Sequence, residues 1–585
     1  MNKTKLLTTA CLIGLAVLAI QNTSCRRVET EPRDWFGEEL VFDTLDRLGT
    51  VAAFNLNDLY NYIPGGFNRI SGDFLDAATD DAVPSRNNTT VQYYTNLSIS
   101  VLNNPDAYWA NSYYGIRRAN IFLQNIGKVP IVQTADSTAA KLTRQYWRAE
   151  ARFIRALMYF ELLKRYGGVP LIGDKIFTLD DDLQVPRNNF EECINYIVNE
   201  CNIIKDSLRK EPVLSADWGR IPRGAAMALK CRVLLYGASP LFNGGGVETD
   251  AKLKALTGYT TADPARWQAV IAAAEELKAL NFYSLLSSGT PNAYASIFTT
   301  KSNAEIILAK QSSNNTGLEN SQAPIGYAGT ASSLGYTSPS QNLVDAYPMV
   351  NGLQPFNADG TINTASGYSA DAPYTNRDPR LDVTVFRNGY TWLGRAVQTF
   401  EGGLDKPNTS TVAIQTKSGY YLRKFLGNFA SGSSYSNQSH NFPIFRYAET
   451  LLNYAEALNE VGRTEEAVAQ IILIRKRAGI AAGANSRYGI PSGISLADMR
   501  ELIHNERRIE LSFEEHRFWD LRRWKKAATN LTGPVYGIKI TNTGTAFTYE
   551  KVQIYDMRFA NKLYHMPIPY DETVKNRALL QNEGW

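Results

Sequence analysis

Acidic residues recur at helical spacing near the carboxyl end of the chain, and paired carboxylates are what glycoside hydrolysis requires. The acids are Glu506, Glu510, Glu514 and Asp520, and the arginines interleaved with them are Arg507, Arg508, Arg517, Arg522 and Arg523. Acids and arginines three or four residues apart on one helix form ion pairs, which lower carboxylate pKa values and remove a general acid. We therefore predict a structural ion-pair network rather than catalysis, and the same for Glu449 and Glu456.

The sequence contains no other catalytic or cofactor signature. The four histidines are His440, His504, His516 and His565, and they show no metal-ligand spacing and no HExxH motif. There is also no GxSxG, Walker A or dinucleotide-binding motif. We therefore expect no catalytic residue, no metal and no cofactor.

Long polar stretches rich in Gly, Ser, Thr, Asn and Tyr lie at residues 64–100, 312–342, 351–380 and 400–440. They are too long for simple connections, and their Tyr, Trp and Asp content favours ordered binding loops over disorder. The chain also has 32 Tyr, 24 Phe and 9 Trp, more than a minimal helical core needs. Sugar binding uses flat aromatic faces with amide, carboxylate or guanidinium groups beside them. These loops are therefore the predicted place of a binding site.

The elements that must position these loops are helices. Apolar residues spaced by three or four predict helices over 147–162, 190–208, 226–236 and 267–277. Asn188 with Glu191 predicts the cap of the second helix, and Pro222 opens the third. A last helix runs from Ser495, capped together with Asp498, to Phe513. Short strands are predicted at 305–310 and within 539–555.

The segment from Tyr454 to Ala467 resembles a tetratricopeptide unit. Ala457 and Ala467 would let two antiparallel helices approach, with Gly462 at the turn between them. With the other helices, this predicts a mainly α fold, a tetratricopeptide-like helical-repeat scaffold with long irregular loops and a few short strands. Four tryptophans on apolar helix faces are assigned to the core: Trp109, Trp147, Trp267 and Trp524.

The first residues have the pattern of a secretory signal. Two lysines precede an apolar run from Leu6 to Ile20, which is too short to span a bilayer, and polar residues lead to Cys25. A cysteine here predicts a lipoprotein, with residues 1–24 as the signal peptide and Cys25 as the lipidated residue. Asn22 departs from the usual pattern, where an aliphatic residue is normal, so simple secretion is the alternative.

The overall charge is close to neutral. Lys and Arg number 61 against 57 Asp and Glu, so the chain has no electrostatic footprint for nucleic acid. Cys193 and Cys201 share one predicted helix, roughly 12 Å apart at ~1.5 Å per residue, which is beyond disulfide reach. A bridge from either one to Cys231 stays open, and buried free thiols are the simpler interpretation.

Several segments, in order along the chain, resemble the SusD/RagB family. The segment LYHMPIPYDE at 563–572 resembles the closing motif of that family. Two further segments, PIFRYAE at 443–449 and ERRIEL at 506–511, resemble the central helices of the family. In the amino-terminal half, IRRAN at 116–120 and EARFIRAL at 150–157 match.

The resemblance implies a single SusD-like domain over residues 25–585, with an N-terminal half at 26–300 and a C-terminal half at 301–585. It further implies a surface-exposed, lipid-anchored protein of the outer membrane that binds a glycan without cleaving it. The implied partner is a SusC-like TonB-dependent transporter barrel, over which family members sit like a lid.

In this family the ligand site uses a loop that corresponds here to residues 72–81 and continues through 85–88. The starch-binding member has a tryptophan just after these acids, and this chain does not, so starch specificity is not carried over. Tyr93 or Tyr94 could replace it, with a strand edge as the alternative. Two further patches are 327–341 and 377–380 with Trp392, and core packing is the alternative for each aromatic. The predicted ligand-binding residues are Asp73, Asp80, Asp81, Arg86, Asn88, Tyr94, Tyr336, Gln341, Arg380 and Trp392.

Two other functions compete with glycan binding. One is a tetratricopeptide-like adaptor that holds a peptide or protein partner without a sugar site. An adaptor would use its helical groove and keep its connections short, so the long aromatic loops favour the glycan. The other is a secreted glycoside hydrolase, in which substitution of one carboxylate would abolish sugar release.

Overall fold

The computed structural model describes residues 38–132, 137–287, 292–327, 333–427 and 435–585. The predicted signal peptide and Cys25 lie outside these residues, so the lipid anchor stays a prediction. Within the described ranges, no helix is both long enough and apolar enough to cross a membrane.

Helices make up most of the regular structure. The longer ones are α3 Thr50–Leu59, α4 Trp109–Asn125, α5 Ser137–Tyr166, α6 Phe190–Ile204, α7 Arg223–Ala238, α9 Arg266–Lys278, α14 Tyr447–Glu460, α15 Thr464–Ala478 and α16 Leu496–Glu510. The short ones are α2 Glu38–Val41, α8 Ala251–Thr257, α10 Asn292–Ser296, α11 Gly317–Gln322, α12 Gln341–Ala346, α13 Pro379–Thr384, α17 Arg517–Arg523, α18 Ala527–Asn530 and α19 Tyr570–Lys575.

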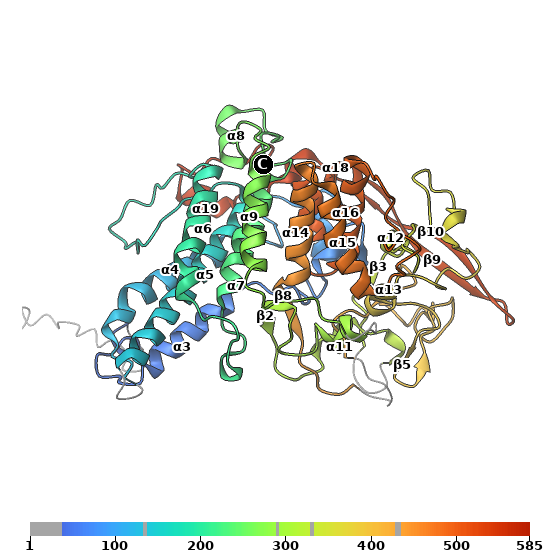
Figure 1. Cartoon of the computed structure of the whole chain (residues 1–585), viewed down its shortest axis with the longest axis horizontal. Helices are drawn as coiled ribbons and strands as arrows, with labels where there is room; N and C mark the ends of the chain where they lie inside the picture. The colour runs from blue at the N-terminus through green and yellow to red at the C-terminus, as the bar shows by residue number, and fades with distance from the viewer. Residues whose placement is uncertain (1–37, 133–136, 288–291, 328–332, 428–434) are drawn as a thin grey trace, which may run out of the picture.

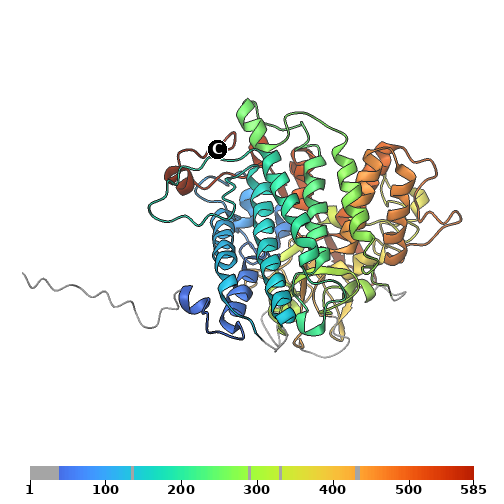
Figure 2. The same ribbon diagram turned by 60° about the vertical axis from the view of Figure 1, so that its left-hand side comes forward.

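The long helices form one continuous array. They pack in the order α4, α5, α6, α7, α9 and α14, with α15 and α16 beside α14 (Figures 1 and 2). Ala457 and Ala467 are fully buried where α14 and α15 meet. Gly462 turns the chain between them with a φ of 82°, a backbone conformation that glycine adopts at little cost. The predicted tetratricopeptide-like scaffold is confirmed.

The helix caps follow the sequence closely. The capping box of α6 uses Asn189 and Glu192, one residue after the predicted pair. The hydroxyl of Ser495 accepts the N–H of Asp498 at 3.1 Å, as predicted for α16. That helix ends before the predicted Phe513, because Phe513 has a φ of 60°, which a helix cannot accommodate.

The strands pair antiparallel, and all of those in the described ranges are short except β9 and β10. They are β1 Ala82–Pro84, β2 Ile306–Gln311, β3 Thr337–Pro339, β4 Val385–Phe386, β5 Thr391–Trp392, β6 Arg395–Ala396, β7 Tyr421–Leu422, β8 Asn441–Arg446, β9 Gly533–Asn542 and β10 Phe547–Met557. The pairs are β1 with β3, β2 with β8, β4 with β7, β5 with β6 and β9 with β10. The predicted strand at 305–310 is β2, and the predicted strands within 539–555 belong to the hairpin β9–β10, which extends away from the helices (Figure 1).

Among the residues that the structure describes, the core consists of two clusters of buried apolar side chains, the second of which lies among α7, α9, α14, α15 and α16. Trp109, Trp147, Trp267 and Trp524 are all buried, as predicted. Cys193, Cys201 and Cys231 are buried free thiols, which confirms the simpler interpretation.

Candidate functional site

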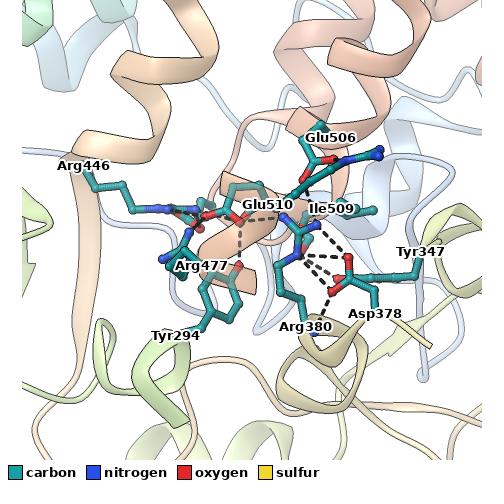
Figure 3. A network of polar contacts seen from close by, with 12 residues as sticks. Tyr294, Tyr347, Asp378, Arg380, Arg446, Arg477, Glu506, Ile509 and Glu510 are labelled. Carbon is teal, nitrogen blue, oxygen red and sulfur yellow. Dashed lines mark hydrogen bonds and ion pairs between the residues drawn. The ribbon is translucent and has the colours of Figure 1, made fainter. Parts of the chain in front are cut away.

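The carboxylates of α16 lie in a buried network of charges (Figure 3). Glu510 lies between three arginines: its side chain is 2.9 Å from Nη1 of Arg380 and 2.7 Å from Nη1 of Arg446, and it also pairs with Arg477. The hydroxyl of Tyr294 donates to the backbone carbonyl of Glu510 at 2.6 Å. These guanidinium groups come from α13, β8 and α15, so Glu510 joins three distant segments of the chain.

The neighbouring acids are paired in the same way. Arg475 donates to Glu506 at 2.8 Å, and Lys424 donates to Glu514 at 2.6 Å. Burial acts to raise the pKa of both carboxyl groups, but the surrounding cations outweigh it and hold each pKa below its usual range. The predicted structural network is confirmed, because none of these acids is available as a protonated general acid.

Only part of the pairing is the expected one: Arg523 pairs with Asp520, three residues before it, at 2.8 Å, as predicted. The arginines interleaved on α16 do not pair with the glutamates of the same helix: Arg507 donates to Asp520 at 2.7 Å, and Arg508 donates to Asp81 at 2.6 Å. Adjacent helical residues point about 100° apart, so the glutamates and arginines of α16 face different neighbours. The arginines that hold the glutamates had to come from other elements.

The predicted binding loop is tied to this part of the fold. Asp80 and Asp81 are 5% and 0% exposed. Arg517 donates two hydrogen bonds to Asp80, at 2.9 and 2.7 Å, and Arg508 bridges both acids. Side chains that are buried and paired in this way cannot reach a glycan, so we correct their assignment from ligand contacts to anchors of the loop.

Burial tends to raise the pKa of every carboxyl group in this loop, but the net shift differs in sign between Asp80 and Asp73. In Asp80 burial is outweighed by the charges of Arg508 and Arg517, and the pKa falls to about 2. In Asp73 burial prevails over the charge of Arg86 and the hydrogen bonds from Arg86 and Thr337, and the pKa rises to about 7. Asp73 is fully buried as well, and it too is reassigned to the interior.

Asp76, beside these residues, gives a first prediction. Burial, followed by the charge of Asp81, raises its pKa from 3.8 to about 8. Its Oδ1 accepts the N–H of Phe513 at 3.0 Å, while Oδ2 has no hydrogen-bond partner in the described chain. A raised carboxyl pKa contributes stability that is fully present below pH 3.8 and lost as the pH rises through 8. Asp76→Asn is neutral at every pH, so we expect the variant to be more stable than the wild type at pH 8.5, by about 1 kcal/mol after the cost of an unpaired amide.

Urea denaturation at pH 4.5, 6.5 and 8.5 checks this prediction. The advantage of the variant should grow from the first pH to the last. An advantage that is equal at all three pH values would contradict the raised pKa of Asp76.

Four more predicted ligand residues lie inside the protein. Tyr94, Gln341, Arg380 and Trp392 are each exposed by 5% or less. The Tyr94 hydroxyl donates to Asn104 at 2.6 Å, and the polar atoms of the other three are likewise bonded within the protein. Core packing, the alternative stated for the aromatics, is therefore correct for Tyr94 and Trp392.

Three predicted residues remain at the surface. Asn88 is exposed, and Arg86 and Tyr336 are half-buried. The Arg86 guanidinium lies 3.7 Å from the centre of the Tyr336 ring and also pairs with Asp73 at 2.8 Å. A Cβ on Gly72 would lie 2.9 Å from the same ring. Neighbouring groups thus cover much of Tyr336, and Asn88 is the freest of the predicted residues.

A groove of about 530 Å³ begins at Asn88. One wall is the segment 88–98, which includes the 3-10 helix η3 Thr90–Tyr94, and the other is the end of β10. The lining residues are Asn88, Thr89, Gln92, Tyr93, Asn96, Ser98, Tyr555, Asp556 and Arg558. The Tyr555 hydroxyl lies 3.1 Å from that of Thr95, which joins the two walls.

The groove contains the chemistry that a sugar needs. Tyr93 and Tyr555 are half-buried aromatic rings, and amide, carboxylate and guanidinium groups lie around them. From the sequence, Tyr93 and Tyr94 are both candidates for the aromatic residue, and the predicted set contains Tyr94. Successive residues of a 3-10 helix point about 120° apart, so Tyr94 enters the core while Tyr93 faces the groove. In the sequence around β10, the strand pattern is the only local feature, and it does not indicate a binding site.

In the described ranges, no three His, Cys, Asp or Glu side chains are grouped so that they could hold a metal ion.

Sequence models of one family match both parts of this chain. The model described as the SusD family matches residues 304–585, and that described as starch-binding, associating with the outer membrane, matches residues 45–235. Among curated relatives, SusD-like protein P38 of Formosa agariphila is 26% identical over 562 residues, covering 90% of this chain and 92% of its own. SusD-like protein P2 of the same organism is 24% identical and covers 81% and 79%.

Solved structures show the same fold. A SusD-like protein from Bacteroides fragilis superposes with a TM-score of 0.75 at 27% identity, over 93% of this chain and 98% of its own. A laminarin-binding SusD-like protein superposes with a TM-score of 0.61 at 23% identity, over 92% and 99%.

Proposed function

Because this chain belongs to the SusD family, we propose that it binds a glycan at the cell surface without cleaving it and delivers it to a TonB-dependent transporter of the outer membrane. The groove between residues 88–98 and the end of β10 is the proposed binding site. The observation that carries this is its pair of half-buried tyrosines, Tyr93 and Tyr555, surrounded by groups that hydrogen-bond hydroxyls.

The absence of cleavage is part of the proposal. Glycoside hydrolysis needs one protonated and one ionised carboxyl group on either side of the bond. Asp556 is the carboxylate of this groove, and the acids first considered for catalysis are buried in ion pairs. This supports binding over hydrolysis.

Affinity electrophoresis tests the function. A soluble form of the protein, which lacks residues 1–25, is run through gels that contain laminarin, starch or other plant, storage and host polysaccharides. The same samples are assayed for released sugar. We expect retardation by one of the glycans without product. Retardation by none of them would favour the adaptor, and release of sugar would favour the hydrolase.

Tyr93→Ala tests the site. Loss of a stacking ring removes its buried apolar area and its ring contact, so we expect about tenfold weaker retention in the gel that retards the wild type. The matched control is Tyr114→Ala, a 64% exposed tyrosine on α4 outside the groove, which should migrate like the wild type. Equal loss in both variants would speak against the groove.

The partner and the anchor belong to the same proposal. A SusC-like transporter barrel is the proposed recipient of the glycan, and the lipid on Cys25 the proposed attachment to the outer membrane. The family description that associates it with the outer membrane supports this location.

A further inference from the structure

A second pocket lies away from the groove, at the junction between the two parts of the chain that match the family. Its volume is about 400 Å³, within the range of small-molecule sites, and it shares no lining residue with the groove. Its walls come from the loop before α7, from the segment after α9 and from β2. Building on the proposed glycan binding, we propose that this pocket is a second site for a neutral saccharide.

Two exposed aromatic rings line the pocket. Trp218 is 48% exposed and Phe282 is 43% exposed. Phe282 is held in place by Tyr283, whose ring packs edge-on against it at 5.2 Å and 87°. Large aromatic side chains left open to solvent on the wall of one pocket need an explanation, and the apolar face of a sugar ring is a suitable partner for both.

A buried carboxylate in the same wall offers a hydrogen-bond acceptor. The side chain of Glu211 is only 2% exposed. Its Oε1 accepts the N–H of Gly224 and the hydroxyl of Tyr283, both at 2.7 Å. Its Oε2 has no hydrogen-bond donor among the described residues, and the cation beside it, Nε of Arg223, is 3.5 Å away. Buried acceptors are normally satisfied, so Glu211 has room for a hydroxyl of a ligand.

The wall depends on a glycine. A Cβ on Gly224 would lie 2.6 Å from the ring of Tyr283 and 2.9 Å from Oε1 of Glu211. Without that Cβ, the first turn of α7 lets the carboxylate and the tyrosine meet behind the two exposed rings. The acceptor and the aromatic surface therefore form one built site.

The charge of the pocket decides the class of ligand. Oε2 of Glu211, which has no hydrogen-bond donor among the described residues, can accept from a hydroxyl group of a ligand. Two cations line the pocket as well, Lys301 and Arg220, and Arg220 is paired with Glu150 at 3.2 Å. Because groups of both signs lie in the wall, a neutral saccharide, whose hydroxyl groups both donate and accept, fits the pocket.

The pocket lies where the two matched segments of the chain meet. The matched segments end at residue 235 and resume at residue 304, and Phe282 and Tyr283 lie between them. Glu211 and Trp218 lie inside the first matched segment, so the pocket combines residues from the matched segments with residues from the stretch between them.

Hydroxyl-radical footprinting read by mass spectrometry tests the proposal. The soluble form that lacks residues 1–25 is oxidised with and without laminarin or soluble starch as the probe. We expect oxidation of Trp218 and Phe282 to fall severalfold with one of the probes. Phe54, 66% exposed on α3, is the internal control and should not change. Tyr93 reports on the groove in the same experiment.

The outcomes separate the two sites. Protection of Tyr93 without protection of Trp218 would overturn the second site and support the groove. Protection of Trp218 without protection of Tyr93 would overturn the groove and support the second site. No protection at Trp218 with either probe overturns this inference. Trp218→Ala should weaken retention in affinity gels about tenfold, while Phe54→Ala should not. Glu211→Gln, which keeps the size of the side chain, should also weaken it if the carboxylate accepts from the sugar.

Discussion

The Glu510→Gln variant is expected to lose about 3–5 kcal/mol of its free energy of unfolding. The substitution keeps the size of the side chain but removes the negative charge that three buried arginines share, Arg380, Arg446 and Arg477 (Figure 3). Each arginine keeps another carboxylate partner, but the buried cluster loses one negative charge and is left with an excess of positive charge. That excess is costly in the interior, and guanidinium groups cannot lose their protons to escape the cost. Urea denaturation followed by far-UV circular dichroism measures the loss, and soluble yield should fall with it.

A matched control separates this effect from the loss of any glutamate. Glu466 pairs with Arg463 on the surface, where the two side chains are 54% and 38% exposed. Glu466→Gln should unfold like the wild type, because water replaces the lost partner. An unfolding curve of Glu510→Gln that overlays that of the wild type would contradict the role given to the network.

The Asp80→Asn variant is expected to lose about 3 kcal/mol of stability while its folded fraction binds glycan as the wild type does. Asp80 receives two hydrogen bonds from Arg517 and pairs with Arg508, so it ties the loop of residues 72–88 to α16 and α17. If Asp80 instead contacted the ligand, the pattern would be the opposite, with binding lost and stability kept. The matched variant is Asn88→Ala, which alters an exposed residue of the groove and should weaken binding without changing stability.

The stability effect of Asp80 should disappear in acid. Its pKa is lowered from 3.8 to about 2, because Arg508 and Arg517 outweigh the effect of burial. A lowered carboxyl pKa contributes stability that is present above pH 3.8 and lost as the pH falls through 2. The difference between wild type and Asp80→Asn should therefore be full at pH 6 and shrink below pH 4. A difference that stays constant from pH 6 to pH 2.5 would show that the ion pairs of Asp80 are not its source.

Asp80→Asn and Asn88→Ala separate the two roles of this loop in the proposed binding site. The acids that resemble ligand residues in sequence hold the loop in place from within, and the exposed end of the same loop, at Asn88 and Tyr93, lines the groove. Ion pairs that fix a loop reduce the entropy it loses on binding, which favours affinity without any direct contact.

The sequence by itself determined the scaffold. Apolar spacing placed the helices, Ser495 placed the start of α16, and Gly462 placed the turn of the tetratricopeptide-like pair, because helix periodicity, caps and turns depend on residues within a few positions of one another. The family motifs are also local strings of residues, and they led to the correct family. The prediction that the acids of α16 are ion-paired needed only their density and the arginines around them.

The tertiary structure decided which side chains face the outside and which partners they have. Asp80 and Arg508 are more than four hundred positions apart, and Tyr93 and Tyr555 are separated by a similar length of chain, so no local pattern relates them. The sequence around an aspartate in a polar loop does not show whether its carboxylate contacts water or a buried arginine. Only packing brings the arginine to it, and that packing also turns Tyr94 inward and leaves Tyr93 at the groove.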